Sequence, residues 1–317
     1  MGDSYNTYMH TKFLVTGGAG FIGSHIAEYL VARGNDVVVI DDLSTGSIRN
    51  LDNFFHKITF YEGSILDRAL LEKAMEGVEC VFHQAAIPSV PRSIKNPIET
   101  HTVNTTGTIA VFDVAKNAHV KRVVYASSSS VYGDSLTLPK IETMEYNPLS
   151  PYAVQKMTGE YYGKLYYKIF GLETVGLRYF NVFGPRQNPD SEYAAVIPKF
   201  IKKIQSDTPV TIYGDGETTR DFTYIDNVVH ANMQASIAER APGEVFNIAL
   251  GSRISLNDLV HAINTLCGKN INTVYEDFRG GDIKHSLADI SKAQDILQYR
   301  PTVSFSEGLQ KTADALS

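Results

Sequence analysis

The segment Ser150-Pro151-Tyr152-Ala-Val-Gln-Lys156 contains the residues best suited to acid–base chemistry. Serine favours the N-cap of a helix and proline its first turn, so this segment predicts the start of a helix. Tyr152 and Lys156 would then lie one turn apart on the same face. A free phenol has a pKa of about 10 and is a poor base at neutral pH. A lysine cation favours the phenolate and lowers that pKa, which makes Tyr152 a candidate general base.

The same spacing recurs at Tyr8 and Lys12, so the spacing alone is not specific. The later pair is distinguished by four serines, Ser127 to Ser130, that follow the apolar run 123–126. If that run is a parallel strand, the serines lie at its carboxyl end, where ligands bind in such sheets. Their hydroxyls would hold a substrate hydroxyl that Tyr152 deprotonates; the alternative is a solvated turn.

A glycine loop occurs near the start of the chain, in Thr16-Gly-Gly-Ala-Gly-Phe-Ile-Gly23. Gly17 permits a tight turn, Gly20 lets the backbone approach a pyrophosphate, and Gly23 allows close packing of helix and strand. The N-terminus of the following helix offers free N–H groups to phosphates. The motif is weak by itself, but it stands between a predicted strand and a predicted helix, as dinucleotide binding requires.

Asp41 ends the second apolar run, 18 residues after Gly23. A carboxylate at this position accepts hydrogen bonds from ribose hydroxyls and repels a 2′-phosphate, so NAD is favoured over NADP. An oxidised nicotinamide would also favour the phenolate of Tyr152. The alternative is that Asp41 or Asp42 only caps a turn.

Short apolar runs separated by segments of helical length must position these residues. A helix is predicted over 21–32, and buried strands over 13–16, 37–40, 58–61, 80–83, 123–126 and 174–178. This pattern indicates an α/β fold with a doubly wound parallel sheet, the Rossmann type. We expect an NAD-binding domain over 1–180, with a return near 224–250. A second, smaller α/β substrate-binding lobe is expected over 181–317.

Composition excludes several other classes of protein. The 317 residues are 43% hydrophobic and carry a net charge of −6 without a dense basic block, which argues against nucleic-acid binding. Two cysteines and no ligand-spaced histidine cluster favour reduced thiols and no bound metal. Residues 1–11 lack an apolar core typical of a signal peptide, and no apolar run is long enough to span a bilayer. We expect a cytoplasmic protein.

Together these motifs resemble the extended short-chain dehydrogenase/reductase family. The resemblance covers nearly the whole chain. It extends to Arg178-Tyr-Phe-Asn-Val-Phe-Gly-Pro185 and to Tyr213-Gly-Asp-Gly-Glu-Thr-Thr-Arg-Asp-Phe-Thr-Tyr-Ile-Asp226. These two segments are similar to the UDP-hexose 4-epimerase branch. The resemblance implies inversion at C4 of a UDP-hexose through a 4-keto sugar, with NAD as a bound catalytic cofactor.

The resemblance also implies a role for individual residues. Ser128, Tyr152 and Lys156 match the catalytic serine, tyrosine and lysine. The residues implied to bind NAD are Gly17, Gly20, Phe21, Ile22, Gly23, Asp41, Asp42, Ser44, Thr45, Gly46, Ser64, Ile65, Gln84, Ala85, Ala86, Asn104, Tyr152, Lys156 and Tyr179. Those implied to bind the UDP-sugar are Pro88, Ser128, Ser129, Ser130, Asn181, Ala195, Val196, Lys199, Tyr213, Arg220, Arg279, Asp282 and Ser286. Guanidinium groups and a lysine suit a pyrophosphate; the alternative for each of these charges is a surface ion pair.

The sequence departs from the family at several positions. Ser64 replaces an aspartate that lies near adenine, which puts that contact in doubt. Branches that dehydrate or decarboxylate place an acid among the strand-end hydroxyls, whereas Ser129 and Ser130 lead into Val131 with no acid; this favours epimerisation. Ser286 falls where the family has a gatekeeper beside the sugar. A small residue there admits a 2-N-acetyl group, so we expect interconversion of UDP-N-acetylglucosamine and UDP-N-acetylgalactosamine, with UDP-glucose and UDP-galactose as further substrates.

Alternatives remain open at this stage. A UDP-glucuronate 4-epimerase has similar strand-end serines, and a non-catalytic NAD-sensing module would retain the glycine loop. By resemblance we expect a homodimer formed through helices near 100–117 and 152–169.

Overall fold

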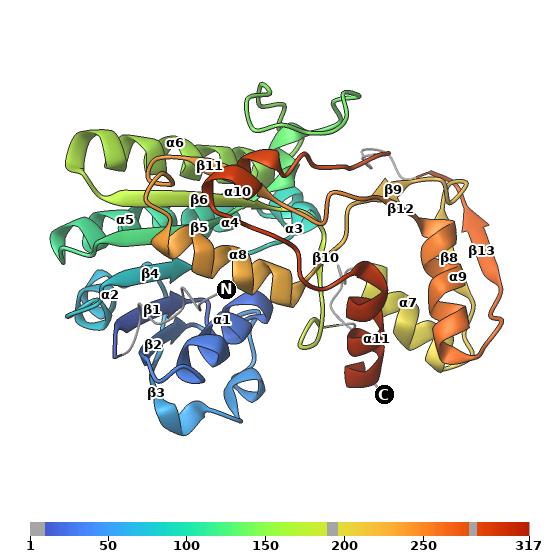
Figure 1. Ribbon diagram of the computed structural model, residues 1–317, viewed down its shortest axis with the longest axis horizontal. Helices are drawn as coiled ribbons and strands as arrows, with labels where there is room; N and C mark the ends of the chain where they lie inside the picture. Colours follow the sequence, from blue (N-terminus) through green and yellow to red (C-terminus); the bar gives the residue numbers. More distant parts are fainter. Residues whose placement is uncertain (1–9, 189–195, 279–283, 317) are drawn as a thin grey trace. The chain divides into compact units, whose positions relative to one another are not determined.

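The computed structural model describes residues 10–188, 196–278 and 284–316. A seven-stranded sheet in the order β11-β6-β5-β4-β1-β2-β3 is the main element (Figure 1). The pairs β3–β2, β2–β1, β1–β4 and β4–β5 are parallel. The strands are β1 (Lys12–Thr16), β2 (Asp36–Asp41), β3 (Ile58–Glu62), β4 (Cys80–His83), β5 (Arg122–Ser128), β6 (Glu173–Tyr179) and β11 (Val245–Ile248).

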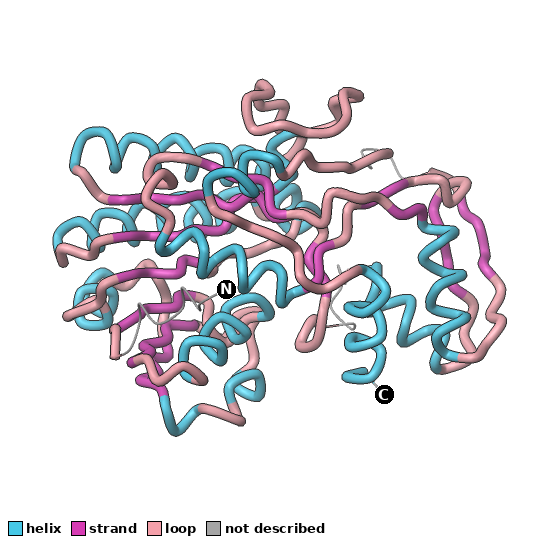
Figure 2. Tube along the Cα trace, in the orientation of Figure 1, coloured by secondary structure: helices cyan, strands magenta, loops and turns pink. Residues whose placement is uncertain are grey.

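The predicted doubly wound α/β fold is confirmed, and each predicted apolar run is a strand of this sheet. Figure 2 shows the alternation of strands and helices along the first half of the chain. The helices there are α1 (Phe21–Val31), α2 (Arg68–Ala74), α3 (Val90–Lys95), α4 (Pro97–His101), α5 (Thr108–Asn117) and α6 (Pro151–Phe170). A π-helical turn, η4 (Thr102–Gly107), joins α4 to α5, and short 3₁₀ turns lie at η2 (Ile48–Leu51), η3 (Phe55–Lys57) and η5 (Ser129–Tyr132).

Helix α6 begins where the sequence predicts. Ser150 is its N-cap, and its hydroxyl accepts a hydrogen bond of 3.2 Å from the amide of Ala153. The helix ends at Phe170 and is capped by Gly171, which adopts the left-handed conformation that glycine tolerates best (φ 72°). Because α6 packs on β5, its first turns lie against the carboxyl end of that strand.

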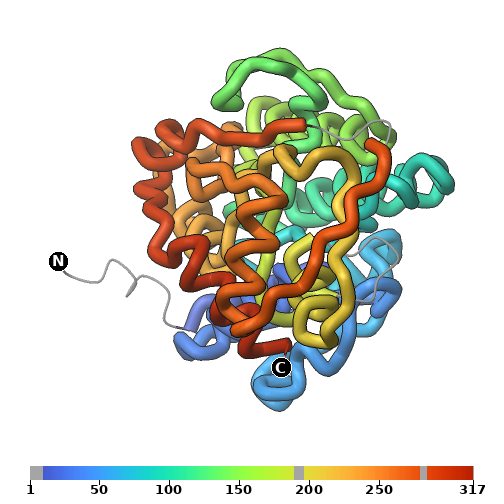
Figure 3. Tube along the Cα trace, turned by 90° about the vertical axis from the view of Figure 1, so that its right-hand side faces the viewer, coloured from blue at the N-terminus to red at the C-terminus, as the bar shows by residue number. Residues whose placement is uncertain are grey.

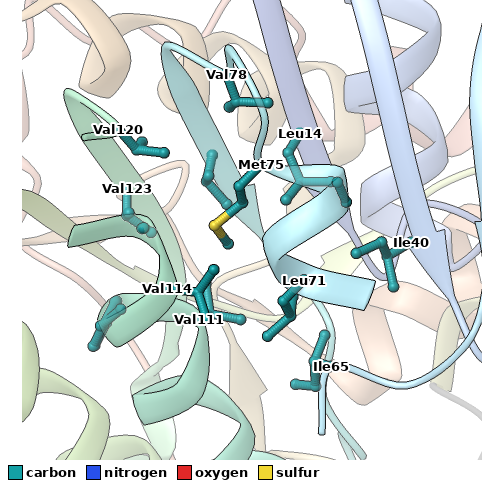
Figure 4. Close-up of a cluster of buried hydrophobic side chains, with 14 of the residues drawn as sticks. Leu14, Ile40, Ile65, Leu71, Met75, Val78, Val111, Val114, Val120 and Val123 are labelled. Atoms are coloured by element: carbon teal, nitrogen blue, oxygen red, sulfur yellow. The ribbon is translucent and has the colours of Figure 1, made fainter. Parts of the chain in front are cut away.

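One hydrophobic core lies between the sheet and the helices on one of its faces (Figure 4). Leu14 and Val123 from the strands meet Leu71 from α2, Met75 directly after that helix, and Val111 from α5. All five side chains are fully buried, and burying each contributes ~1.5–3 kcal/mol. This core fixes the strand ends that carry the polar residues described below.

Contacts between Cα atoms divide the chain into two compact units. Unit 1 comprises 1–128, 150–178 and 229–245, and unit 2 comprises 129–149, 179–228 and 246–317. Two-stranded sheets in unit 2 pair β7 (Val182–Phe183) with β10 (Thr223–Tyr224), β9 (Thr219–Arg220) with β12 (Ile254–Ser255), and β8 (Val210–Tyr213) with β13 (Thr273–Glu276). The domain limits that we expected from the sequence stay a prediction.

The helices of the second half are α7 (Val196–Gln205), α8 (Ile225–Ile237), α9 (Leu256–Cys267), α10 (Ser291–Ile296) and α11 (Phe305–Leu316). Within unit 2, α7, α9 and α11 pack on one another; α9 and α11 are among the orange and red segments that face the viewer in Figure 3. Among the helices within the described ranges, none combines the length and the apolarity needed to cross a bilayer.

Candidate active site

The glycine loop forms a cradle for a ligand, and its glycine positions leave no room for a side chain. Gly17 has a φ of +68°, and a Cβ added there would lie 2.6 Å from the backbone nitrogen of Ala85. A Cβ on Gly23 would lie 2.1 Å from the carbonyl oxygen of Gly17. Gly20 is the N-cap of α1 and has no side chain to satisfy the first-turn amides of that helix. The free amides and the dipole of α1 suit the pyrophosphate of a dinucleotide.

Asp41 lies at the end of β2 and is 7% exposed. Its carboxylate accepts hydrogen bonds from the amides of Ala19 (2.9 Å) and Leu43 (2.8 Å), so it connects the glycine loop to the turn after β2. Burial raises the pKa of Asp41, and these backbone hydrogen bonds oppose the rise. Asp42 accepts from the amide of Ser44 in a turn of its own. Both aspartates therefore cap turns, and Asp41 also lies beside the cradle.

Other residues expected near the dinucleotide follow the neighbouring strands. The side chain of Ile65 is in the hydrophobic core, so only its backbone is available to a ligand. The hydroxyl of Ser64 accepts from the amide of Leu66, and the amide group of Gln84 donates to Asn232. Phe21 and Ile22 open α1, and Thr45 and Gly46 lie in the loop after β2.

The side chain of Asn104 forms several hydrogen bonds within the protein, which the sequence did not reveal. Its side chain accepts from the amide of Ile87 (2.7 Å) and donates to the carbonyl of Ile87 (3.1 Å) and to Gln155 (2.8 Å). The π-helical turn η4 places it there, at 2% exposure. Asn104 therefore fixes the segment after β4 against α6, and both hydrogens of its side-chain amide serve that purpose.

A second buried network lies between β1 and β4. Nδ1 of His83 is 2.7 Å from the hydroxyl of Thr16, and Nε2 is 2.9 Å from the hydroxyl of Thr108. Thr108 itself donates to the carbonyl of Asn104, so it accepts from His83. Burial, with a smaller effect from the charge of Lys156, lowers the pKa of His83 to about 3. His83 is thus a neutral structural histidine, which sequence reasoning did not single out.

Ser128, Tyr152 and Lys156 come together at the carboxyl end of β5. The side chain of Tyr152 is hydrogen-bonded to that of Ser128. Lys156 donates from Nζ to the carbonyl of Ala126 (2.8 Å), with Nζ 5.8 Å from the centroid of the Tyr152 ring. The amide of Tyr152 donates to the hydroxyl of Ser93, which anchors the first turn of α6.

The expected fall in the pKa of Tyr152 is not found. Burial raises the pKa of Tyr152 to about 12, and the hydrogen bond with Ser128 opposes that rise. Burial lowers the pKa of Lys156 to about 8, whereas the charge of Glu160 opposes that fall. Desolvation of the phenol outweighs any effect of the ammonium. At neutral pH the site therefore holds a neutral phenol beside a lysine that is mostly charged.

In unit 2, the segment with Arg220 lies beside that with Ser286. The amide of Ser286 donates to the carbonyl of Thr219 (3.1 Å), and a guanidinium nitrogen of Arg220 donates to the carbonyls of Thr219 and Lys284. The neighbouring Asp221 is fully buried and accepts hydrogen bonds from backbone amides, among them those of Leu250, Gly251 and Ala288. Burial raises the pKa of Asp221 to about 7. Sequence reasoning missed Asp221, although it follows Arg220 directly.

The remaining residues expected to bind substrate are less closely grouped. Asn181 donates to the carbonyl of Asp221, and Tyr213 lines an open hollow of about 830 Å³ with Tyr275 and Phe278. Val196 begins α7, and Lys199 is exposed on that helix. Ser129 and Ser130 form the start of η5, Tyr179 ends β6 with 8% exposure, and Pro88 is exposed. Ala195, Arg279 and Asp282 lie outside the described residues.

Comparison with known proteins places this geometry in a family. A family model described as NAD dependent epimerase/dehydratase matches residues 13–249. A UDP-glucose 4-epimerase of Mycolicibacterium smegmatis is 37% identical over 307 residues, which cover 96% of this chain and 97% of that protein.

Solved structures agree with this. A UDP-N-acetylglucosamine 4-epimerase from Methanobrevibacter ruminantium M1, in complex with UDP-N-acetylmuramic acid, is 41% identical with a TM-score of 0.93, covering 97% of this chain and 98% of that one. A UDP-glucuronic acid 4-epimerase from Bacillus cereus, in complex with UDP-glucuronic acid and NAD, is 36% identical with a TM-score of 0.90, covering 96% and 99%. The cradle at the end of β1 and these matches lead to one conclusion: the chain belongs to the NAD dependent epimerase/dehydratase family.

Proposed function

We propose that this chain inverts the C4 configuration of a UDP-hexose through a 4-keto sugar. The observation that carries the proposal is the meeting of Ser128, Tyr152 and Lys156 at the carboxyl end of β5, in the unit that also holds the glycine cradle. Support comes from relatives along nearly the full chain whose names describe 4-epimerases of UDP-sugars.

In the proposed reaction Tyr152 exchanges a proton with the 4-hydroxyl oxygen of the sugar. The hydroxyl of Ser128 shares a hydrogen bond with the phenol, so it keeps the phenolic oxygen oriented and can hold the same sugar oxygen. NAD supplies, when bound, a hydride acceptor and donor and, in its oxidised form, a positively charged ring. Lys156 adds a fixed cation at the edge of the site.

A phenol with a pKa of about 12 carries its proton at neutral pH, so it holds the proton that the 4-keto oxygen needs when hydride returns to C4. To act as a base it needs nearby positive charge, because that charge stabilises the phenolate in a site where water does not. Lys156 is placed to contribute, since Nζ is already fixed by the carbonyl of Ala126 and loses little freedom. The proposed residues thus supply both halves of the proton cycle.

We propose UDP-N-acetylglucosamine and UDP-N-acetylgalactosamine as the main pair of substrates, with UDP-glucose and UDP-galactose as a second pair. The support is the small side chain of Ser286, whose backbone is bound to Thr219 beside Arg220. Arg220 is proposed to bind the diphosphate, for which a guanidinium fork is well suited. The likeness to the Methanobrevibacter ruminantium enzyme points the same way.

A second candidate is C4 inversion of UDP-glucuronate. It is favoured by the likeness to the Bacillus cereus enzyme, which has a TM-score of 0.90. The two candidates share the proton chemistry of Tyr152. The glucuronate sugar carries a carboxylate at C6 and a hydroxyl at C2, whereas the N-acetylated sugars carry a hydroxymethyl group at C6 and an acetamido group at C2.

The test is incubation of the purified protein with single UDP-sugars, followed by NMR of the configuration at C4. Conversion of UDP-N-acetylglucosamine supports the main proposal, and conversion of UDP-glucuronate alone supports the second candidate. The absence of any inversion with every UDP-sugar, in protein that contains NAD, would reject both.

We further propose the homodimer that the sequence predicts, formed by the helices near 100–117 and 152–169, with α4 at the start of the first segment and α6 as the second. The support is a run of exposed apolar side chains on these two contacting helices: Ile98 (82% exposed), Val154, Tyr161, Leu165 and Ile169. Replacing Leu165 with Glu should yield monomers, as measured by light scattering.

A cytoplasmic location is also proposed, supported by the free thiols of Cys80 and Cys267.

A further inference from the structure

The end of β5 and the first turns of α6 are joined by a regular set of contacts. Lys156 donates to the carbonyl of Ala126, Glu160 accepts from the hydroxyl of Ser127, and Tyr152 is hydrogen-bonded to Ser128. Successive strand residues thus meet helix residues that are four apart, because these lie on one face of α6. Two of the three contacts involve residues proposed for catalysis, whereas Glu160 has no assigned role.

The carboxylate of Glu160 is held more firmly than a carboxylate in a surface ion pair. Nε and Nη2 of Arg178 donate to its two carboxylate oxygens at 2.9 Å and 2.6 Å, from the neighbouring strand β6. Both side chains are 1% exposed. The bidentate contact with the guanidinium fixes the position of the Glu160 carboxylate, and the low polarity of the surroundings strengthens its electrostatic interactions over a short range.

Lys156 is the neighbour on which this charge acts. Burial removes the ammonium from water and disfavours its charged form, and Glu160 is the carboxylate whose charge opposes that effect. The other titratable groups around Lys156 are Tyr152 on α6 and His83 on β4, with Arg178 on β6 beyond Glu160. Tyr152 and His83 are neutral at pH 7, because burial raises the pKa of the phenol to about 12 and lowers that of the imidazole to about 3.

We propose that Glu160, fixed by Arg178 and Ser127, is a positioning residue. It keeps the ammonium of Lys156 charged and holds the end of β5, which includes Ser128, against α6. This inference rests on the proposed function for its catalytic meaning. Its electrostatic part concerns only residues of this chain. Without the carboxylate, the pKa of Lys156 falls further, so a smaller fraction of the lysine is charged at neutral pH and it stabilises the phenolate of Tyr152 less.

The test measures the titration of Lys156 directly, in protein labelled with ¹³Cε-lysine and without any sugar nucleotide. The resonance of Lys156 is assigned by its loss in Lys156→Arg. In the unchanged protein we expect a pKa of about 8. In Glu160→Gln we expect a value lower by about one unit or more. An unchanged value in Glu160→Gln overturns the proposal.

Two further variants separate electrostatics from damage to the fold. Glu160→Gln leaves the guanidinium of Arg178 buried without its partner, so the double variant Glu160→Gln, Arg178→Met removes both charges. The pKa of Lys156 should fall in the double variant also, because Glu160 is the partner that acts on it. The matched control is Glu173→Gln, which breaks the ion pair between Glu173 and Arg122 at the amino ends of β6 and β5. That control should leave the Lys156 titration unchanged.

A pH profile of turnover links the charge to activity. Because Lys156 must be protonated, the alkaline limb of kcat/KM, which reports the enzyme without bound substrate, should shift to lower pH in Glu160→Gln by the same amount as the Lys156 titration. A fall in kcat at all pH values, with no shift in the limb, would mean a purely structural role. If no UDP-sugar is turned over at all, the proposed function fails while the NMR titration still decides the electrostatic claim.

Discussion

An ion pair lies at each end of strands β5 and β6, and the two pairs differ in burial and in their neighbours. At the amino ends, Arg122 of β5 pairs with Glu173 of β6 at 2.6 Å. At the carboxyl ends, Arg178 of β6 pairs with Glu160 of α6, also at 2.6 Å. The first arginine also donates to the carbonyls of Ala235 and Ala238, in and just after the last turn of α8. Those carbonyls are backbone acceptors that a cation stabilises at a helix C-terminus.

The second pair is surrounded by side chains that can do chemistry. Glu160 accepts from Ser127 and acts on Lys156, and these lie next to Ser128 and Tyr152. Similar ion-pair chemistry therefore stabilises the sheet at one end and supports the proposed site at the other. This agrees with the general placement of ligand sites at the carboxyl ends of parallel strands.

The largest effect is expected for Tyr152→Phe, at the carboxyl end of β5. Loss of the phenolic hydroxyl removes the proposed acid and base, so turnover should fall by ~10²–10⁴ or more, while bound NAD is retained. Tyr167→Phe on the same helix is the control, since Tyr167 is 40% exposed and has no proposed role in the reaction. Activity is measured by NMR of the sugar product and NAD by its absorbance after extraction. Near-normal turnover of Tyr152→Phe would refute its assigned role.

Stability should also distinguish the two ends. Glu160→Gln removes the carboxylate partner of a fully buried guanidinium, at a cost of about 3–5 kcal/mol in the free energy of unfolding. The side chain of Glu173 is 29% exposed, so water compensates in part and Glu173→Gln should cost only ~1 kcal/mol. Urea unfolding followed by circular dichroism compares them. Equal losses would show that the two pairs do not differ in burial as described.

Glycine substitutions extend the contrast to β1 and β2. A Cβ at Gly23, after the carboxyl end of β1, would lie 2.1 Å from a loop carbonyl, so Gly23→Ala should distort the cradle and lower the NAD content at least about tenfold. Gly34, before the amino end of β2, has a φ of +77° and nothing within 4 Å of an added Cβ. Gly34→Ala should cost about 1–2 kcal/mol in stability and leave the NAD content unchanged. Loss of NAD in both variants would contradict the assignment of the cradle.

The smallest expected effect concerns choice of substrate in unit 2. Ser286→Tyr places a bulky ring beside Arg220 and should reduce turnover of the acetylated pair about tenfold relative to the plain hexoses. This magnitude corresponds to the ~1–3 kcal/mol by which a pocket discriminates between substrates that differ in a small group. Competition between UDP-N-acetylglucosamine and UDP-glucose in one reaction measures the ratio. An equal loss for both pairs would reject the gatekeeper role.

Much of this arrangement could be predicted from the sequence because it is encoded locally. The apolar runs predict the strands, and Ser150 and Pro151 predict the start of α6. The glycine spacing predicts a cradle, because only a residue without Cβ fits at Gly17 and Gly23.

The buried polar network could not be predicted in the same way. Arg178 stands in an apolar run and Glu160 in a helix, and only tertiary packing brings them together. The one local signal was the spacing of Lys156 and Glu160, one helical turn apart. The partners of His83 and Asn104 come from other strands and helices, so residue type alone did not reveal that they are fully engaged. The pKa of Tyr152 was misjudged because desolvation depends on burial that the sequence does not show.

The most direct test of the proposed C4 chemistry is the fate of the hydrogen at C4. The protein is incubated in D₂O with UDP-N-acetylglucosamine, and the C4 position of the UDP-N-acetylgalactosamine product is examined by ¹H NMR. Because the hydrogen leaves C4 and returns to it without exchanging with water, we expect the product to retain full protium at C4. Deuterium at C4 of the product would contradict the account, since it would mean that Tyr152 or another base removes a proton from carbon.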